Sequence, residues 1–139
     1  MNYSRLAIVA VTSAILGACL DSAGPRTFLV TRIDNASRDS TGLRVAFRVT
    51  NAGARSEDIP ACGGQPSPRV ARQQGPRWDE IGGGLCLAIY SSIPIALAPG
   101  ESVSAATGLC CVEPGVYRLV ISYNVDGSPR AVSAPFSVQ

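Results

Sequence analysis

From residue 27 onward, apolar and polar side chains alternate along the chain with a period of two rather than 3.6. The clearest stretch is 43–50, in which every second residue from Leu43 to Val49 is apolar. This alternation predicts a strand with one buried and one solvated face. Two further stretches, 116–124 and 131–138, show the same pattern. Their expected inward faces are Tyr117, Leu119, Ile121 and Tyr123 in the first, and Val132, Ala134, Phe136 and Val138 in the second.

Shorter β-type runs fill the rest of this region, and Gly and Pro residues separate them. The segment 85–98 is apolar enough for a buried helix, but Pro94 and the isoleucines favour a strand. Pro135 indicates that the last strand lies at a sheet edge. Seven to eight short strands with turns about every ten residues predict an all-β, two-sheet antiparallel sandwich. The additional expected strands are 28–34, 69–73, 77–81, 93–97 and 102–107.

Two Pro-Gly turns, at 99–100 and 114–115, precede the last strands, and Tyr117 follows the second turn. This arrangement resembles the ends of immunoglobulin-like domains in bacterial surface proteins, in which a tyrosine at this place pins a corner. The layout of residues 28–138 also looks like the small sandwich of the BsuPI-type proteinase inhibitors. These resemblances imply an immunoglobulin-like fold for residues 27–139, and the second implies an inhibitor role.

The first 18 residues have the composition of a signal peptide. Arg5 lies in a short polar start, and Leu6–Leu16 is apolar apart from two hydroxyl residues. This run is shorter than the roughly 20 residues that a membrane-spanning helix needs, and it ends in small residues as a cleavage site does. We therefore expect export from the cytoplasm and removal of residues 1–18.

The sequence Leu16-Gly17-Ala18-Cys19 resembles the lipobox of bacterial lipoproteins. The resemblance implies cleavage before Cys19, lipidation of that cysteine, and attachment to a membrane of the cell envelope. Leu20 after the cysteine is typical of lipoproteins sent to the outer membrane of a two-membrane bacterium, on either its periplasmic or its surface side. Residues 19–26 then form a short tether. The alternative is an ordinary secretory leader in which Cys19 has no special role.

The charged residues exclude several kinds of function. The chain has twelve arginines and ten carboxylate side chains, which gives a net charge of +2. This charge is too small to provide a basic surface for binding nucleic acid. The chain has no histidine, so Ser-His-Asp and Cys-His nucleophiles and His-ligated zinc are excluded. The carboxylates are scattered, without a close pair of the glycosidase type. We therefore predict a protein that is not an enzyme and needs no cofactor.

Four cysteines remain besides Cys19, and an even number in an oxidising compartment predicts disulfide bonds. We favour Cys62–Cys86, which would close a glycine- and proline-rich loop, together with a vicinal bond between Cys110 and Cys111. Crossed pairings between the two sets stay open, because neighbours on a strand point to opposite faces. The spacing is not that of a zinc site, so we expect no metal, but redox chemistry at the adjacent pair is an alternative.

The only tryptophan, Trp78, lies near Arg72 and Arg77. The three could form a binding anchor, although a lone tryptophan beside a disulfide is more often a packing residue. The leading hypothesis is a non-catalytic, lipid-anchored module that binds another envelope protein or a surface polymer. The alternatives are a protease inhibitor or chaperone-like accessory that presents the 59–86 loop, and a redox or metal-handling protein that uses Cys110 and Cys111.

Overall fold

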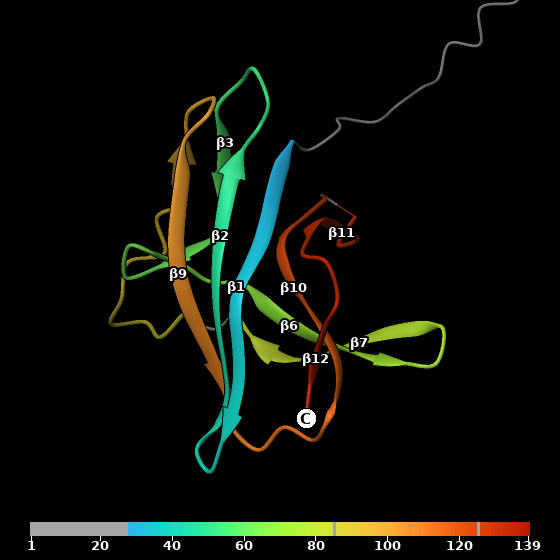
Figure 1. The fold of residues 1–139 in the computed structure, drawn as a ribbon. Coiled ribbons are helices and arrows are strands. Elements are labelled where there is room, and N and C mark those ends of the chain that lie inside the picture. Colours follow the sequence, from blue (N-terminus) through green and yellow to red (C-terminus); the bar gives the residue numbers. More distant parts are fainter. Residues whose placement is uncertain (1–27, 85, 125) are drawn as a thin grey trace, which may run out of the picture.

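The computed structural model describes residues 28–139 except residues 85 and 125 (Figure 1). The predicted signal peptide, Cys19 and the tether lie outside the described residues. Within the described part of the chain, no helix is long and apolar enough to cross a membrane.

The described residues form an antiparallel β-sandwich, which confirms the predicted all-β class. One sheet has the strand order β1-β2-β9, and the other has the order β11-β10-β6-β7 with β12 also paired to β10. Two small sheets, β3-β8 and β4-β5, complete the fold. The strands are β1 (Leu29–Asp39), β2 (Gly42–Asn51), β3 (Glu57–Ile59), β4 (Ala61–Cys62), β5 (Gln65–Pro66), β6 (Arg69–Gln74), β7 (Arg77–Gly83), β8 (Ile95–Leu97), β9 (Ser102–Leu109), β10 (Gly115–Tyr123), β11 (Pro129–Val132) and β12 (Phe136–Val138).

The first sheet is organised around β2, which pairs with β1 on one side and β9 on the other. The predicted inward residues of β2, from Leu43 to Val49, are at most 1 % exposed. These side chains are buried against the second sheet and form the centre of the core. The alternation of apolar and polar residues in the sequence therefore matches the alternation of inward and outward side chains in β2.

Strand β10 is the centre of the second sheet. Its residues Tyr117, Leu119 and Ile121 lie in the core as predicted, and the Tyr117 ring stacks on Phe136 with 6.3 Å between ring centroids. Tyr123, the fourth residue of the predicted face, is instead partly exposed and contacts charged side chains. Register shifts in the pairing of β10 with β11 fall between residues 120 and 123, where the regular alternation ends.

The last predicted strand is wrong in one respect, because residues 131–138 form two strands rather than one. Strands β11 and β12 both pair with β10, and Pro135 lies between them. The break changes the phase of the alternation: Ala131 is buried, whereas Val132 is 39 % exposed and Ala134 is exposed. Proline lacks the N–H that a continuous strand would need, which explains the interruption.

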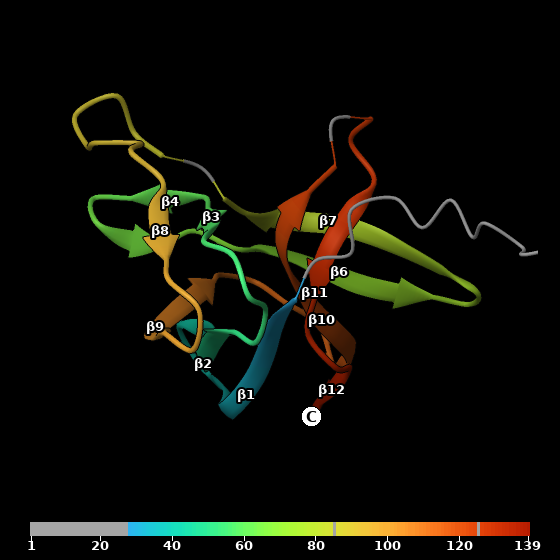
Figure 2. The same cartoon turned by 90° about the horizontal axis from the view of Figure 1, so that it is seen from above.

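Two segments project from opposite sides of the sandwich in both views (Figures 1 and 2). One is the hairpin of β6 and β7, and the other is the connection from β7 to β8. The second projection contains Cys86 and lies near the short β4–β5 hairpin.

Candidate functional site

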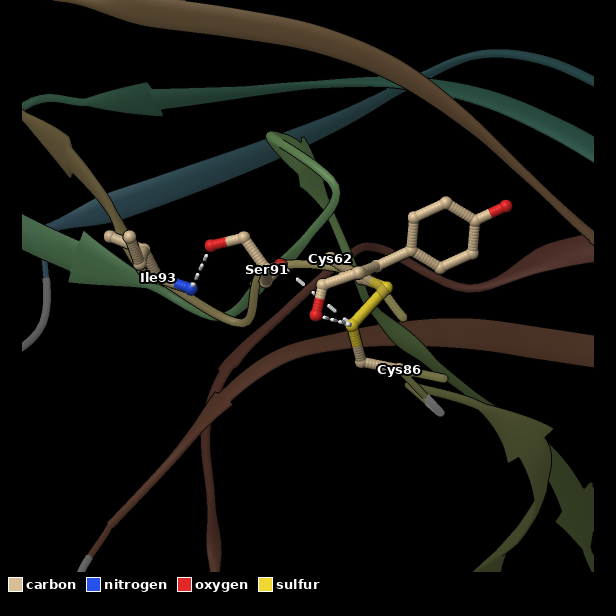
Figure 3. The surroundings of a disulfide bond; sticks show 5 residues. Cys62, Cys86, Ser91 and Ile93 are labelled. Carbon is tan, nitrogen blue, oxygen red and sulfur yellow. Dashed lines mark hydrogen bonds between the residues drawn. A yellow bond between two sulfur atoms is a disulfide. The ribbon is translucent and has the colours of Figure 1, made fainter. Parts of the chain in front are cut away.

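The predicted bond between Cys62 and Cys86 is formed, with a Cα–Cα distance of 5.3 Å (Figure 3). Cys62 ends β4, and Cys86 follows the glycines at the end of β7, so the bond joins the β4–β5 hairpin to the start of the β7–β8 connection. The bond therefore limits the freedom of a segment that belongs to neither large sheet.

Hydrogen bonds shape the segment that follows Cys86. The N–H of Tyr90 donates to the carbonyl oxygen of Leu87 at 2.9 Å, which closes a turn. The N–H of Gly63 donates to the carbonyl oxygen of Ser91 at 2.8 Å. The N–H of Ile93 donates to Ser91 Oγ at 3.3 Å (Figure 3). Gly63 has a φ of 59° and lies against the Tyr90 ring. The disulfide and the Gly63 contact hold the segment at two adjacent points.

Residues 87–93, which we name the apolar loop, expose large hydrophobic side chains. Ile89 is 81 % exposed, Ile93 74 %, Leu87 64 % and Tyr90 53 %. No charged residue occurs between Ile81 and Glu101 in the sequence, so the loop carries no charge of its own. Four large apolar side chains exposed within seven residues make this loop a candidate interaction surface.

For an inhibitor or accessory role, the sequence predicts that the segment 59–86 is the presented loop. The structure instead folds most of that segment into strands β4 to β7 and exposes the residues directly after Cys86. The sequence shows a long uncharged run at 82–100, within which Pro94 and the isoleucines of 85–98 favour a strand rather than an exposed loop. That lack of charge is the signal that could have located the loop.

An open cavity of about 350 Å³ lies beside the apolar loop. Its walls come from two stretches of the chain, residues 58–67 and residues 84–94. The site therefore combines projecting apolar side chains with an adjacent hollow that a partner's side chain could occupy.

Cys110 and Cys111 do not form the expected vicinal bond, because both are free, exposed thiols in the structure. They lie in the connection from β9 to β10, and Cys111 has a φ of 59°, in the left-handed region. In this turn both thiols lie at the surface, and no bond joins them. The pKa of the Cys111 thiol is raised, first by its hydrogen bond with Cys110 and then by the charge of that neighbour.

The predicted trio of Arg72, Arg77 and Trp78 does not form one surface. Arg72 donates to the Glu113 carboxylate at 2.7 Å and to the carbonyl oxygen of Pro114 at 3.1 Å, so it fastens the β9–β10 connection. Trp78 is covered by the guanidinium of Arg118, 4.4 Å from the ring centroid. In the β6–β7 register Trp78 is opposite Gln73, whereas Arg72 is opposite Asp79, so Trp78 and Arg72 point to different faces.

A polar cluster that sequence reasoning missed lies near Trp78. Arg69 pairs with Glu80 at 2.8 Å and lies over the Tyr123 ring, and the Tyr123 hydroxyl donates to Glu80. The pKa of Glu80 is lowered, first by the bond from Tyr123 and then by Arg69. The pKa of Tyr123 is raised well above its usual value, mainly by burial and then by the bond to Glu80.

Among the residues that the structure describes, no group of three or more Cys, Asp or Glu side chains is placed to hold a metal ion.

Comparisons with known proteins find little similarity. No protein-family model matches the chain, and no curated protein matches it. One solved structure, a beta-glucosidase from Kluyveromyces marxianus in complex with glucose, aligns over 81 % of this chain with 16 % sequence identity and a TM-score of 0.44. The chain spans 14 % of the length of that protein.

Proposed function

We propose that this protein is a non-catalytic, lipid-anchored module of the cell envelope that binds another envelope protein through the apolar loop. The observation that carries the proposal is the exposure of Leu87, Ile89, Tyr90 and Ile93 on a loop fastened by the Cys62–Cys86 bond. Fastening lowers the entropy that is lost when a loop is ordered on binding, so apolar contact area contributes more to affinity.

The chemistry of the loop favours a protein over a surface polymer as the partner. The exposed groups are three aliphatic side chains and one tyrosine, without a charged neighbour between residues 82 and 100. Apolar and aromatic anchors of this kind fill pockets at protein–protein interfaces. The lipid on Cys19 would hold the domain near the membrane, as the lipobox resemblance implies.

The proposal is tested by placing a photo-crosslinking amino acid at position 89 of the full-length protein in its own membranes. We expect one reproducible crosslinked protein, and we expect the crosslink to decrease at least tenfold when Leu87→Ser and Ile93→Ser are added. The matched control places the crosslinker at Arg77, on the opposite projection. Equal crosslinking from both positions, or none from position 89, would contradict the proposal.

A second candidate function is protease inhibition, and the fastened loop is the observation that favours it. A disulfide at one end and the Gly63–Ser91 hydrogen bond near the tip would slow the release of a cleaved loop. The full-length protein should then inhibit at least one member of a protease panel. Steady cleavage after a residue of the loop, without loss of protease activity, would exclude this function.

A further inference from the structure

The connection from β9 to β10 presents two adjacent free thiols on a fixed support. Leu109, at the end of β9, pairs with Leu43, and Val112 is only 7 % exposed. Cys110 and Cys111 are therefore a two-residue exposed arch between two anchored residues. Because the two cysteines are neighbours in the chain and anchored residues flank them, their thiols stay close to one another.

The residues that follow the arch are also held. The Tyr117 hydroxyl donates to the carbonyl oxygen of Glu113, and Arg72 binds both Glu113 and Pro114. These contacts fasten the connection to β10 and β6, so the thiols are carried by the sandwich rather than by a free loop.

A cavity of about 400 Å³ lies directly beside the thiols. Its walls are formed by both cysteines and by apolar side chains. Arg72 and Glu113 also line the cavity, and they form an ion pair in which the two charges offset each other. The apolar walls are Ile81, Leu109, Val112 and Tyr117. The hollow offers space for an apolar residue of a molecule whose sulfur contacts Cys110 or Cys111.

We propose that Cys110 and Cys111 are a reactive dithiol that exchanges with the disulfide bond of an apolar peptide or of a small thiol compound. The Cys110 thiolate attacks one sulfur of that disulfide, forms a mixed disulfide and releases the first thiolate. Cys111 then loses its proton to solvent, attacks the Cys110 sulfur and expels the second thiolate. The two cysteines are oxidised to a vicinal disulfide, and the incoming disulfide is reduced to two thiols that take up protons from solvent.

The two cysteines have different roles in this exchange. The pKa of the Cys111 thiol is raised, first by its hydrogen bond with Cys110 and then by the charge of that neighbour, which supports the resolving role of Cys111. The small ring of a vicinal disulfide is strained, which makes the oxidised form easy to reduce and the exchange reversible.

The test uses the reduced full-length protein with the Cys62–Cys86 bond intact, mixed with glutathione disulfide or with a cysteine-bridged peptide that carries apolar residues beside its cysteines. After alkylation, the intact mass should show that neither Cys110 nor Cys111 carries the alkyl group. The chain should be lighter by two hydrogens, as expected for one new disulfide bond. In Cys111→Ser the mixed disulfide on Cys110 should persist at least tenfold longer than in the unmodified chain. Cys110→Ser should react more slowly than Cys111→Ser.

The two oxidants identify the source of the disulfide. At least tenfold faster reaction with the peptide assigns the cavity to a polypeptide, and equal rates assign the pair to small thiol compounds. One adduct on each cysteine, no reaction, or rapid loss of the mixed disulfide in Cys111→Ser would overturn the proposal. The Leu87→Ser and Ile93→Ser variant should exchange normally, which separates this result from the proposed function.

Discussion

At the scale of single residues, Asn51 connects more of the fold than its place in an Asn-Ala-Gly turn suggests. Its side chain is fully buried, and its amide donates to the carbonyl oxygens of Arg55 at 2.7 Å and Leu97 at 2.8 Å. Its Oδ1 accepts the N–H of Gly53 at 2.9 Å. One side chain thus joins the end of β2 to the turn after it and to β8.

Replacing Asn51 with alanine should lower the free energy of unfolding by about 2–4 kcal/mol, because two carbonyl groups and one N–H lose their partners at buried or partly buried positions. Chemical denaturation monitored by circular dichroism measures this change. The control is Thr50→Ala, which removes an exposed hydroxyl bonded to Ser102. A loss within 0.5 kcal/mol of the control would show that water replaces the Asn51 contacts.

Tyr117 is the residue whose role was expected from the immunoglobulin-like resemblance. Its hydroxyl bonds to the carbonyl oxygen of Glu113, four residues upstream, as a tyrosine corner does. Tyr117→Phe keeps the buried ring and removes only this bond, so we expect a loss of about 1–2 kcal/mol in denaturant unfolding. An unchanged midpoint would mean that Arg72 alone holds the β9–β10 connection.

Glu80 gives the fold a pH dependence with a defined sign. Its pKa is lowered in the folded state by Tyr123 and Arg69, so the ionised carboxylate favours folding above its ordinary pKa near 4.5. This contribution is lost as the pH falls through the lowered value. Glu80→Ala should therefore reduce Tm at pH 7, and this reduction should become smaller as the pH falls below 4.5. A reduction that does not change with pH would show that packing rather than charge is responsible.

At the scale of the elements, the long strands were predictable because the alternation of apolar and polar residues in the sequence matches the alternation of buried and exposed residues in the sandwich. In β2, every second residue is apolar and the same residues are buried, from Leu43 to Val49. Strands β3, β4 and β5 could not be predicted, since two or three residues carry no visible alternation. The split at Pro135 could not be predicted, because it depends on how β11 and β12 each pair with β10, and the sequence alone does not show this pairing.

The candidate site was predictable only in part, for a related reason. The Cys62–Cys86 pairing followed from the need to close a glycine-rich segment, and it is confirmed. The covering of Trp78 by Arg118 depends on the β6–β10 register, in which Arg118 lies opposite Ala71. Contacts between distant strands of this kind are set by topology, so residues close in sequence gave the wrong grouping.

Removing the disulfide with Cys62→Ser and Cys86→Ser should destabilise the protein by about 3 kcal/mol, since the bond closes a loop with a sequence separation of 24 residues. It should also increase proteolysis within the apolar loop, measured by limited digestion. The matched control is Cys110→Ser with Cys111→Ser, which should leave both quantities unchanged because these thiols are free. Equal effects from the two pairs would show that the bond does not fasten the loop.

At the scale of the whole molecule, membrane attachment and partner binding are expected to reside in different parts of the chain. The lipid on Cys19 would supply attachment, because two or more buried acyl chains hold a protein essentially permanently. The apolar loop would supply recognition. An alternative arrangement, in which the loop itself enters the membrane, would make both parts contribute to attachment.

Membrane fractionation of two full-length variants distinguishes these arrangements. Cys19→Ser should lose fatty-acid labelling and move to the soluble fraction or stay unprocessed, with unchanged folding of the sandwich. Ile89→Ser with Ile93→Ser should remain in the membrane fraction at the level of the unmodified chain, because two exposed aliphatic side chains add little to a permanent lipid anchor. Retention of Cys19→Ser in the membrane, followed by its release when the loop substitutions are added, would assign attachment to the loop and contradict the division of roles.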